Sequence, residues 1–408
     1  MKLCRRDFMR GGVALFSLGF TGSDLMMRMA AAQGTANPAR DRDILVMIEM
    51  NGGNDGLNTL IPYADPAYYA NRPTLGIPRT RVLDIGGQVG LHPSMGQLKA
   101  LFDAGEVAVI QGVGYPNANQ SHFRSMDIWQ TAVPEQQVSL GWLGRYLDQI
   151  SDDDKNALYG IAFETDLPRE FRGEHSQVPA IPDFASYRYQ TDPNNPQDRA
   201  AQINAFTQIS SHVPVNLPYV GLVQTNIMDA YTTADRIQAA GAYKPTITYP
   251  KSGLSDALKL VAESITKQFG THLFHVVIGG FDTHANQSGQ QAKLLGDLSN
   301  ALAAFFQDLK NHGAADNVLA VTFSEFGRRV RENGSAGTDH GAASVLFAVG
   351  GKVKGGLYGT YPSLNALNDG NLQYNVDFRR VYAAVLENWL AADSAPVLNG
   401  TFDPMPFI

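Results

Sequence analysis

The stretch Ile44-Leu-Val-Met-Ile-Glu-Met-Asn-Gly-Gly-Asn-Asp55 carries the clearest structural signal in the chain. Its apolar run Ile44–Met50 is too short for a buried helix, so we interpret it as a core strand. A polar cluster that includes Asn51 and Asp55 follows directly. The same arrangement, a short apolar run with polar residues after it, recurs at three later places: Val107–Ile110, Phe274–Ile278 and Val318–Phe323.

Predicted helices lie between these strands. Ser94–Ala104 and Ser121–Thr131 have helical spacing, with Ser94 and Ser121 as expected N-caps. Alternation of strand and helix predicts an α/β fold, a doubly wound and mostly parallel sheet with helices on both faces. The pattern returns near the C-terminus, with helices expected at Ser255–Gln268, Leu294–Leu309 and Asp377–Ala391 and a strand at Val345–Val349.

The stretch between the two regular regions lacks a clear alternation of strand and helix. Residues 151 to about 255 are rich in turn signals, such as Asp152-Asp-Asp154 and Thr191–Pro196. We expect a partly helical insertion in an α/β domain that spans residues 42–408. Two interpretations stay open: the insertion covers the site or presents specificity loops, or it is a plain surface excursion.

Residues 1–32 resemble a twin-arginine export signal. Arg5-Arg6 precedes the apolar stretch Val13–Phe20, and Ala30-Ala-Ala32 offers a cleavage site. About eight apolar residues cannot cross a hydrocarbon core that needs roughly 20. We therefore expect a periplasmic or otherwise exported protein that uses the twin-arginine translocation machinery and keeps no stable membrane span after cleavage.

Composition narrows the class of function. The chain has 408 residues, and its one cysteine, Cys4, lies in the predicted signal, which excludes a thiolate ligand or cysteine nucleophile from the mature protein. Removal of residues 1–32 takes away five basic and two acidic residues and changes the formal charge from −7 to −10. An acidic chain without a basic run argues against nucleic-acid binding.

Carboxylates and imidazoles follow the predicted strands. In an open α/β sheet the carboxyl ends of the strands form the ligand-binding edge, and mixed oxygen and nitrogen donors there suit a divalent metal. We expect one or two ions, zinc first, with manganese or calcium as alternatives. The candidate ligands are Asp55, Asp282, His284, Glu325, Asp339 and His340.

Several of these residues have a second interpretation. Asp282 can cap a turn and His284 can pack against the core. Asp339 can serve as the outer carboxylate that fixes the tautomer of His340 instead of a ligand. Glu325 can form a structural salt bridge with a following arginine, Arg328 or Arg329.

Ser121 is the candidate nucleophile. A helix N-terminus offers free N–H groups and a positive dipole end to an anion such as a phosphoryl group, although serine is also an ordinary N-cap. Asn51, His122 and Arg328 are candidate substrate-binding residues, and His122 is alternatively a metal ligand or a plain first-turn residue. The other histidines are expected in core or surface roles: His92, His175, His212, His272, His275 and His312.

Five motifs together resemble the exported DUF1501 family, whose function is unknown. They are Gly52-Gly-Asn-Asp-Gly-Leu-Asn58, Ser121-His-Phe123, Gly280-Phe-Asp-Thr-His284, Ser324-Glu-Phe-Gly-Arg328 and Gly337-Thr-Asp-His-Gly341. That family is similar to a distant branch of the alkaline phosphatase and sulfatase superfamily. The resemblance implies an alkaline-phosphatase-like fold with one or two metals beside a nucleophile.

By this resemblance Asp55 matches the metal carboxylate after the first strand and Ser121 the nucleophile. Asp282 and His284 match one metal site, Glu325 the aspartate after the later strand, and His340 the distal histidine. One departure is Phe326, which stands where alkaline phosphatases have histidine, so either His122 replaces it or only one metal binds. The sulfatase motif of Cys or Ser followed by x-Pro-x-Arg does not occur in the sequence, which argues against a formylglycine nucleophile.

These features lead to one expected function and one alternative. The expected function is an exported metal-dependent hydrolase that acts on a small-molecule or polymeric phosphate ester, or a related ester, with Ser121 attacking. The alternative is a non-catalytic periplasmic binding or assembly protein on the same scaffold, because a fold alone does not imply activity.

The predicted signal can be tested on exported protein. We expect the mature chain to begin near Gln33, because the alanines before it form the cleavage site. N-terminal sequencing of the periplasmic fraction of the native host measures this. Protein found only in the cytoplasm with its Met1 end intact would contradict it.

Overall fold

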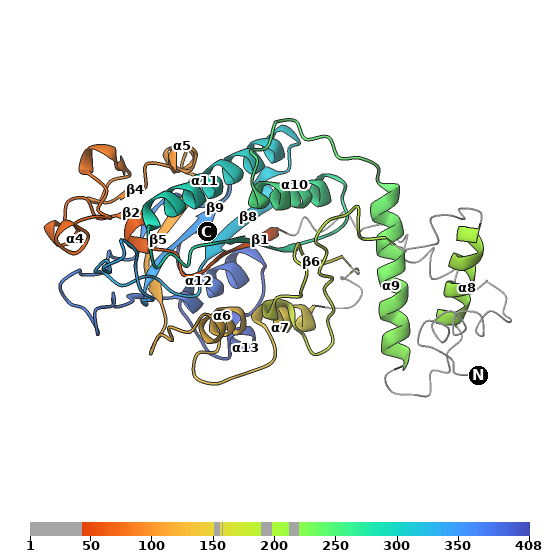
Figure 1. Ribbon diagram of the computed structural model, residues 1–408. Helices are drawn as coiled ribbons and strands as arrows, with labels where there is room; N and C mark the ends of the chain where they lie inside the picture. The colour runs from red at the N-terminus through yellow and green to blue at the C-terminus, as the bar shows by residue number, and fades with distance from the viewer. Residues whose placement is uncertain (1–42, 151–155, 157, 189–197, 212–219) are drawn as a thin grey trace, which may run out of the picture. The chain divides into compact units, whose positions relative to one another are not determined.

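The computed structural model describes residues 43–150, 156, 158–188, 198–211 and 220–408. The predicted export signal lies outside the described residues. The chain divides into two compact units (Figure 1), and the larger consists of Asp41–Pro182 together with Tyr243–Ile408. The smaller contains Asp183–Ala242, with helices α8 (Arg199–Ser211) and α9 (Val220–Ala239).

The larger unit is built on an eight-stranded sheet with the order β10-β5-β9-β8-β1-β7-β6, where β11 also pairs with β5. In this sheet β9 runs antiparallel to β5 and β8, and the other pairs are parallel. This confirms the mostly parallel α/β sheet. The strands are β1 (Ile44–Asn51), β5 (Val107–Gly114), β6 (Gly160–Ala162), β7 (Leu273–Gly279), β8 (Val318–Phe323), β9 (Ser344–Val349), β10 (Gly356–Tyr358) and β11 (Val376–Asp377).

Helices cover both faces of this sheet, as predicted (Figure 1). One face carries α5 (Gly96–Asp103), α10 (Gly253–Thr266) and α11 (Gln287–Asn311). The other carries α6 (His122–Thr131), α7 (Trp142–Gln149), α12 (Phe378–Ala384) and α13 (Ser394–Leu398). The π-helical turn η6 (Val385–Trp389) extends α12, and η3 (Arg169–Phe171) packs against α6 and α7.

Short elements complete the larger unit. A small antiparallel sheet has the order β2-β4-β3 and lies outside the main sheet. Its strands are β2 (Leu60–Ile61), β3 (Leu83–Asp84) and β4 (Gly90–Leu91); the remaining helical turns are α3 (Gly56–Thr59), α4 (Pro66–Asn71), η1 (Arg79–Arg81) and η5 (Ala315–Asn317).

Two predicted helix starts differ in detail from the structure. The residue at the N-cap of α5 is Met95, so the prediction that Ser94 caps this helix is wrong. Instead, Ser94 lies in a turn, where its N–H donates to Nδ1 of His92 at 3.1 Å. Ser121 is the N-cap residue of α6 as predicted, but its side chain accepts no backbone hydrogen bond there.

Aromatic packing fixes α6 against the sheet. The ring of Trp129 in α6 stacks on Phe378 of α12 with centroids 4.4 Å apart, and Trp142 of α7 stacks on Tyr382 of α12 at 4.3 Å. All four side chains are buried. Trp129 Nε1 also donates to the carbonyl of Glu325 at 2.8 Å. The first turn of α6 is therefore held close to the residues that follow β8.

The antiparallel strand β9 decides which loops meet. Because β9 runs opposite to β8, its beginning lies at the edge where β1, β7 and β8 have their carboxyl ends. The loop before β9 carries Asp339 and His340, and the loop after β5 leads to Ser121. Five segments that are distant in sequence thus reach one edge of the sheet.

Two further expectations concern the insertion and the membrane. The expected insertion of about residues 151–255 overlaps the smaller unit, and its role stays a prediction. Within the described part of the chain, no helix combines the length and the apolar character that spanning a bilayer requires.

A buried polar cluster lies beneath the sheet edge. Nδ1 of His275 in β7 lies 2.8 Å from Glu170 Oε1, and its Nε2 lies 3.7 Å from Glu49 Oε2. Burial alone lowers the pKa of His275, but the charges of Glu170 and Glu49 outweigh it and raise the pKa above 6.5. Burial also raises the pKa of Glu49 above 4.5. The folded protein therefore holds protons here more tightly than the unfolded chain.

This cluster predicts a loss of stability at alkaline pH. The stabilisation from protonated His275 is fully present below the unfolded pKa of about 6.5 and is lost as pH rises through the higher folded pKa. We expect the unfolding free energy of wild type to exceed that of His275→Gln by more at pH 6.5 than at pH 9, in urea titrations. An equal difference at both pH values would contradict this.

Candidate metal centre

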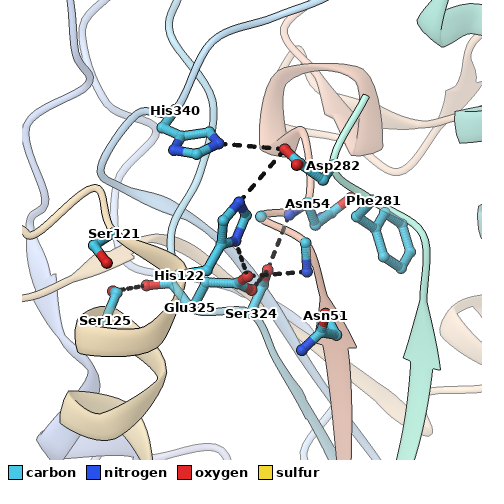
Figure 2. A network of polar contacts seen from close by, with 12 residues as sticks. Asn51, Asn54, Ser121, His122, Ser125, Phe281, Asp282, Ser324, Glu325 and His340 are labelled. Carbon is cyan, nitrogen blue, oxygen red and sulfur yellow. Dashed lines mark hydrogen bonds and ion pairs between the residues drawn. The ribbon is translucent and has the colours of Figure 1, made fainter. Parts of the chain in front are cut away.

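Three imidazoles converge on one carboxylate oxygen at the sheet edge, and Figure 2 shows two of them, His122 and His340, beside Asp282. Oδ1 of Asp282 lies 2.9 Å from His284 Nε2, 3.2 Å from His340 Nε2 and 3.5 Å from His122 Nε2. Asp282 and His284 come from the loop after β7, His122 from the first turn of α6, and His340 from the loop before β9. The sequence-predicted residues Asp282, His284 and His340 therefore do lie together.

The opposite nitrogen of each imidazole has its own acceptor. Nδ1 of His122 lies 2.7 Å from Glu325 Oε1, Nδ1 of His340 lies 2.8 Å from the carbonyl of Gln120, and Nδ1 of His284 lies 3.3 Å from Asp339 Oδ1. An N–H that donates at Nδ1 leaves the lone pair of a neutral ring on Nε2. All three rings then present lone pairs to the same small volume.

A divalent cation would suit this arrangement, although the guanidinium of Arg328 already pairs with Asp282 Oδ1. The Nε2 atoms of His284 and His340 are only 3.0 Å apart, and His122 Nε2 is buried without a hydrogen-bond partner among the described residues. A proton on one ring relieves one contact, whereas a divalent cation accepts all the lone pairs together. Three imidazole nitrogens and one carboxylate oxygen match the four-coordinate donor sets that zinc takes. The residues present therefore fit a metal ion.

The core of this donor set is compact and reachable. One ligand atom each from His122, Asp282 and His340 lie within 4.8 Å of one another. The side chains of Asp282 and His284 are 48% and 45% exposed, so solvent reaches the centre from one side. Zinc held by all four donors would take a further ligand from solution only as a fifth ligand, on the exposed side of the centre.

Asp282 is ionised under ordinary conditions. Burial on its own raises the pKa of this carboxyl, but the hydrogen bond and charge of Arg328, together with His340 and His284, lower it to about 2. A carboxylate that is charged at neutral pH can bind a cation without first losing a proton.

Arg328 positions Asp282. Its side chain is fully buried, and Nη2 donates to Asp282 Oδ1 at 2.7 Å. Nη2 also donates to the carbonyls of Gly52 and Phe281, Nε donates to Gly53, and Nη1 donates to Thr338, so that four main-chain carbonyls hold the group. A guanidinium so enclosed does not meet a substrate, so the expectation that Arg328 binds substrate does not fit its placement. The rival expectation, a salt bridge from Glu325 to Arg328, is not what the structure shows either, since Arg328 pairs with Asp282.

Glu325 lies behind the imidazoles. It is fully buried, and its Oε1 accepts from His122 and from the backbone N–H of Gly52 at 2.9 Å. The carboxylate therefore orients His122 in the manner of an outer partner of a metal-binding histidine. Asp339 has the same relation to His284. Glu325 and Asp339 were both predicted to bind the metal, but each contacts the Nδ1 atom of an imidazole whose Nε2 faces the centre.

A close approach of two loops fixes the distance between these parts. Gly52 has φ of +115°, and a Cβ added there would meet the backbone nitrogen of Asp282 at 2.5 Å. Only glycine allows the loop after β1 to pack so closely on the loop after β7. In addition, Phe281 N–H donates to the carbonyl of Asn51 at 3.1 Å.

Asp55 is not part of the donor cluster, which corrects the expectation for this residue. Its carboxylate is buried and pairs with Arg72, with Oδ2 2.5 Å from Nη1 and Oδ1 3.0 Å from Nη2. Gln287 also donates to Oδ2. No local pattern predicts this pair, because Arg72 follows Asp55 by 17 residues, across several short elements.

Two further candidates, Asn51 and Ser121, are exposed and do not contact the donor cluster. Asn51 is exposed at the end of β1, and its Nδ2 donates to Glu49 Oε1 at 2.7 Å. Ser121 is exposed at the N-cap of α6, immediately before the site residue His122. In Figure 2 no contact joins Ser121 to the cluster, and Ser125 lies one turn further along the helix.

The comparisons with known proteins identify the family. The family model described as "Protein of unknown function (DUF1501)" matches residues 42–389. The chain belongs to the DUF1501 family. No curated protein matches it.

Several solved structures are similar to this DUF1501 protein at low identity. One is a protein in the alkaline phosphatase superfamily from Vibrio parahaemolyticus, with a TM-score of 0.43, 9% identity, and coverage of 96% of this chain and 80% of that chain. Another is the lipoteichoic acid synthase LtaP from Listeria monocytogenes, with a TM-score of 0.36, 11% identity, and coverage of 92% and 80%. A third is the C-terminal periplasmic domain of EcEptC from Escherichia coli in complex with Zn, with a TM-score of 0.35, 10% identity, and coverage of 77% and 75%.

The assignment of Asp55 predicts a stability effect and no metal effect. Replacing Asp55 with Leu leaves Arg72 buried without its partner, which we expect to lower the unfolding free energy by about 3–5 kcal/mol. The double variant Asp55→Leu/Arg72→Leu should recover part of this loss. Urea unfolding measures both. A folded Asp55→Asn protein that no longer binds metal would contradict the assignment.

The donor cluster predicts which residues control metal affinity. Alanine variants of His122, Asp282, His284 and His340 should each lower zinc affinity more than about 100-fold, because each removes a ligand. Glu325→Gln should lower it about 10- to 100-fold, because His122 stays in place but is oriented less firmly. Competition titration with a chelating dye measures this. The matched control is His175→Ala, which removes an exposed histidine outside the cluster and should bind zinc as wild type does. If all four ligand variants keep wild-type affinity, the centre is not a metal site.

Proposed function

We propose that this protein is an exported metal-dependent hydrolase of phosphate or related esters. The observation that carries the proposal is the convergence of three imidazole Nε2 atoms on Asp282 Oδ1 at a solvent-reachable edge of the sheet. His122, Asp282, His284 and His340 would hold the ion, with zinc as the first expectation. When bound, the ion would act as a Lewis acid that stabilises negative charge on the transferred group.

The first turn of α6 supports a site for an anion beside this centre. The helix has ten residues, and its N-cap residue Ser121 leaves the early N–H groups of the helix uncapped by its side chain. Free N–H groups and the positive end of the helix dipole favour a phosphoryl oxygen at this position. His122, the first residue of the helix, ties this N-terminus to the metal centre.

Ser121 remains our proposed nucleophile. Its hydroxyl is exposed and is not used as a helix cap, and Ser121 precedes the site residue His122. Attack of Oγ on the phosphorus would release the alcohol, with the hydroxyl proton passing to solvent and the departing oxygen taking one up. Water would then hydrolyse the phosphoserine. Arg328 would keep Asp282 in place throughout, because it is anchored to four carbonyls.

This role of Ser121 can be tested by substitution. Ser121→Ala should abolish ester hydrolysis by zinc-loaded protein and change the unfolding free energy by less than about 0.5 kcal/mol, since no capping bond is lost. Turnover of phosphate mono- and diesters, phosphonate esters and sulfate esters should be measured with zinc, manganese and calcium. The matched control is Ser335→Ala, an exposed serine in the loop before β9.

Two outcomes would count against the proposal. No turnover by metal-loaded wild type across the panel would favour the non-catalytic alternative on this scaffold. Equal turnover by wild type and Ser121→Ala would show that water attacks the ester directly and would remove Ser121 from the mechanism.

A further inference from the structure

Two large hydrophobic side chains stand out on the surface of the described residues. Phe123 is 88% exposed and Tyr374 is 38% exposed, and they are the only large hydrophobic residues in the exposed class in this part of the chain. A single exposed ring is common on protein surfaces, so it is the place of Phe123 beside His122, and not its exposure alone, that links it to the candidate site.

Phe123 borders the metal centre. It directly follows His122, whose Nε2 faces Asp282, and it belongs to the first turn of α6. In an α-helix the Cα–Cβ bonds tilt toward the N-terminus, so this side chain leans toward the rim that carries Ser121. Its ring is distinct from that of Phe326, which is buried and packs on His122 and His340 with centroids 4.9 Å and 4.7 Å away.

Tyr374 belongs to the same edge of the sheet. A Cβ added to Gly114, the last residue of β5, would lie 2.9 Å from Tyr374 Cβ and 3.5 Å from the Cα of Ala343. Ala343 follows His340 by three residues, and the next residue, Asn375, donates its N–H to the carbonyl of Gly112 at 2.9 Å. These contacts fix Tyr374 at the end of β5, the strand whose loop leads to Ser121 and Phe123.

We propose that Phe123, with Tyr374 as a second contact, binds a planar apolar ring of the substrate, so that the site prefers aryl esters to alkyl esters. This inference rests on the proposed function, because the anionic group of the same substrate occupies the metal centre. Offset stacking on an exposed phenyl ring favours an aromatic group over a short alkyl group of the same charge. Burying the two ring faces then adds to the affinity that the anion receives from the metal centre.

The test uses binding of ligands that cannot turn over. Affinities of zinc-loaded full-length protein for phenylphosphonate and methylphosphonate are measured by calorimetry, together with the pairs benzenesulfonate and methanesulfonate, and benzoate and acetate. We expect the aryl member of a pair to bind wild type at least about 10-fold more tightly than the methyl member. Phe123→Ala should lose most of this ratio while leaving the affinity for the methyl member unchanged.

Further variants separate the ring from other effects. Phe123→Tyr keeps a ring and should restore the aryl preference, whereas Phe123→Leu keeps apolar bulk without a ring and should restore only part. Tyr374→Ala should reduce the preference by a smaller factor. His340→Ala should weaken both members of each pair equally, because it acts on the anionic group.

The outcomes distinguish this inference from the proposed function. Equal affinities within every pair, or no binding of any ligand to wild type, would overturn the aryl preference. Retention of the preference in Phe123→Ala would also overturn it. An aryl preference that holds for benzoate or benzenesulfonate but not for phosphonate would support the ring contact and contradict phosphate esters as substrates.

Discussion

The buried guanidinium of Arg328 holds the candidate site together. Its N–H groups reach the carbonyls of Gly52 and Gly53 after β1, Phe281 after β7 and Thr338 before β9, and they also reach the Asp282 carboxylate. A planar, permanently charged group with donors in a fixed fork can bridge three loops in this way, and lysine cannot. Removing Arg328 would leave four carbonyls and a carboxylate without their donor. Both the geometry of the centre and the stability of the sheet edge therefore depend on this residue.

Around this anchor the charges are arranged so that a cation completes them. Glu325 and Asp339 accept from His122 and His284, and the Gln120 carbonyl accepts from His340. These outer contacts set the ring orientation and make the inner nitrogens better donors. A bound ion would offset the cost of bringing the three ring lone pairs together, while Arg328 already balances the charge of Asp282.

The strands of the sheet could be predicted from the sequence more fully than the contacts of the metal centre. Ile44–Met50 and Val318–Phe323 were recognised as strands because short apolar runs report burial on both faces of a sheet. The position of His340 in the cluster followed from the sheet edge, but the antiparallel direction of β9, which brings it there, has no local signal.

Residue roles that depend on distant partners could not be predicted. Asp55 has the expected place after the first strand, and its pairing with Arg72 is visible only in three dimensions. His275 is an ordinary strand residue until Glu49 and Glu170 are placed beside it. His122 was expected to contact substrate or to be a ligand, and its neighbour Ser121 was the only hint of its place at the sheet edge.

Anomalous diffraction from a zinc-soaked crystal of the protein, collected at the zinc absorption edge, would examine the metal centre itself. The account predicts one strong peak about 2.0–2.2 Å from Nε2 of His122, His284 and His340 and from a carboxylate oxygen of Asp282. A peak on Asp55 or Glu325, or no peak at the sheet edge at full zinc loading, would contradict it.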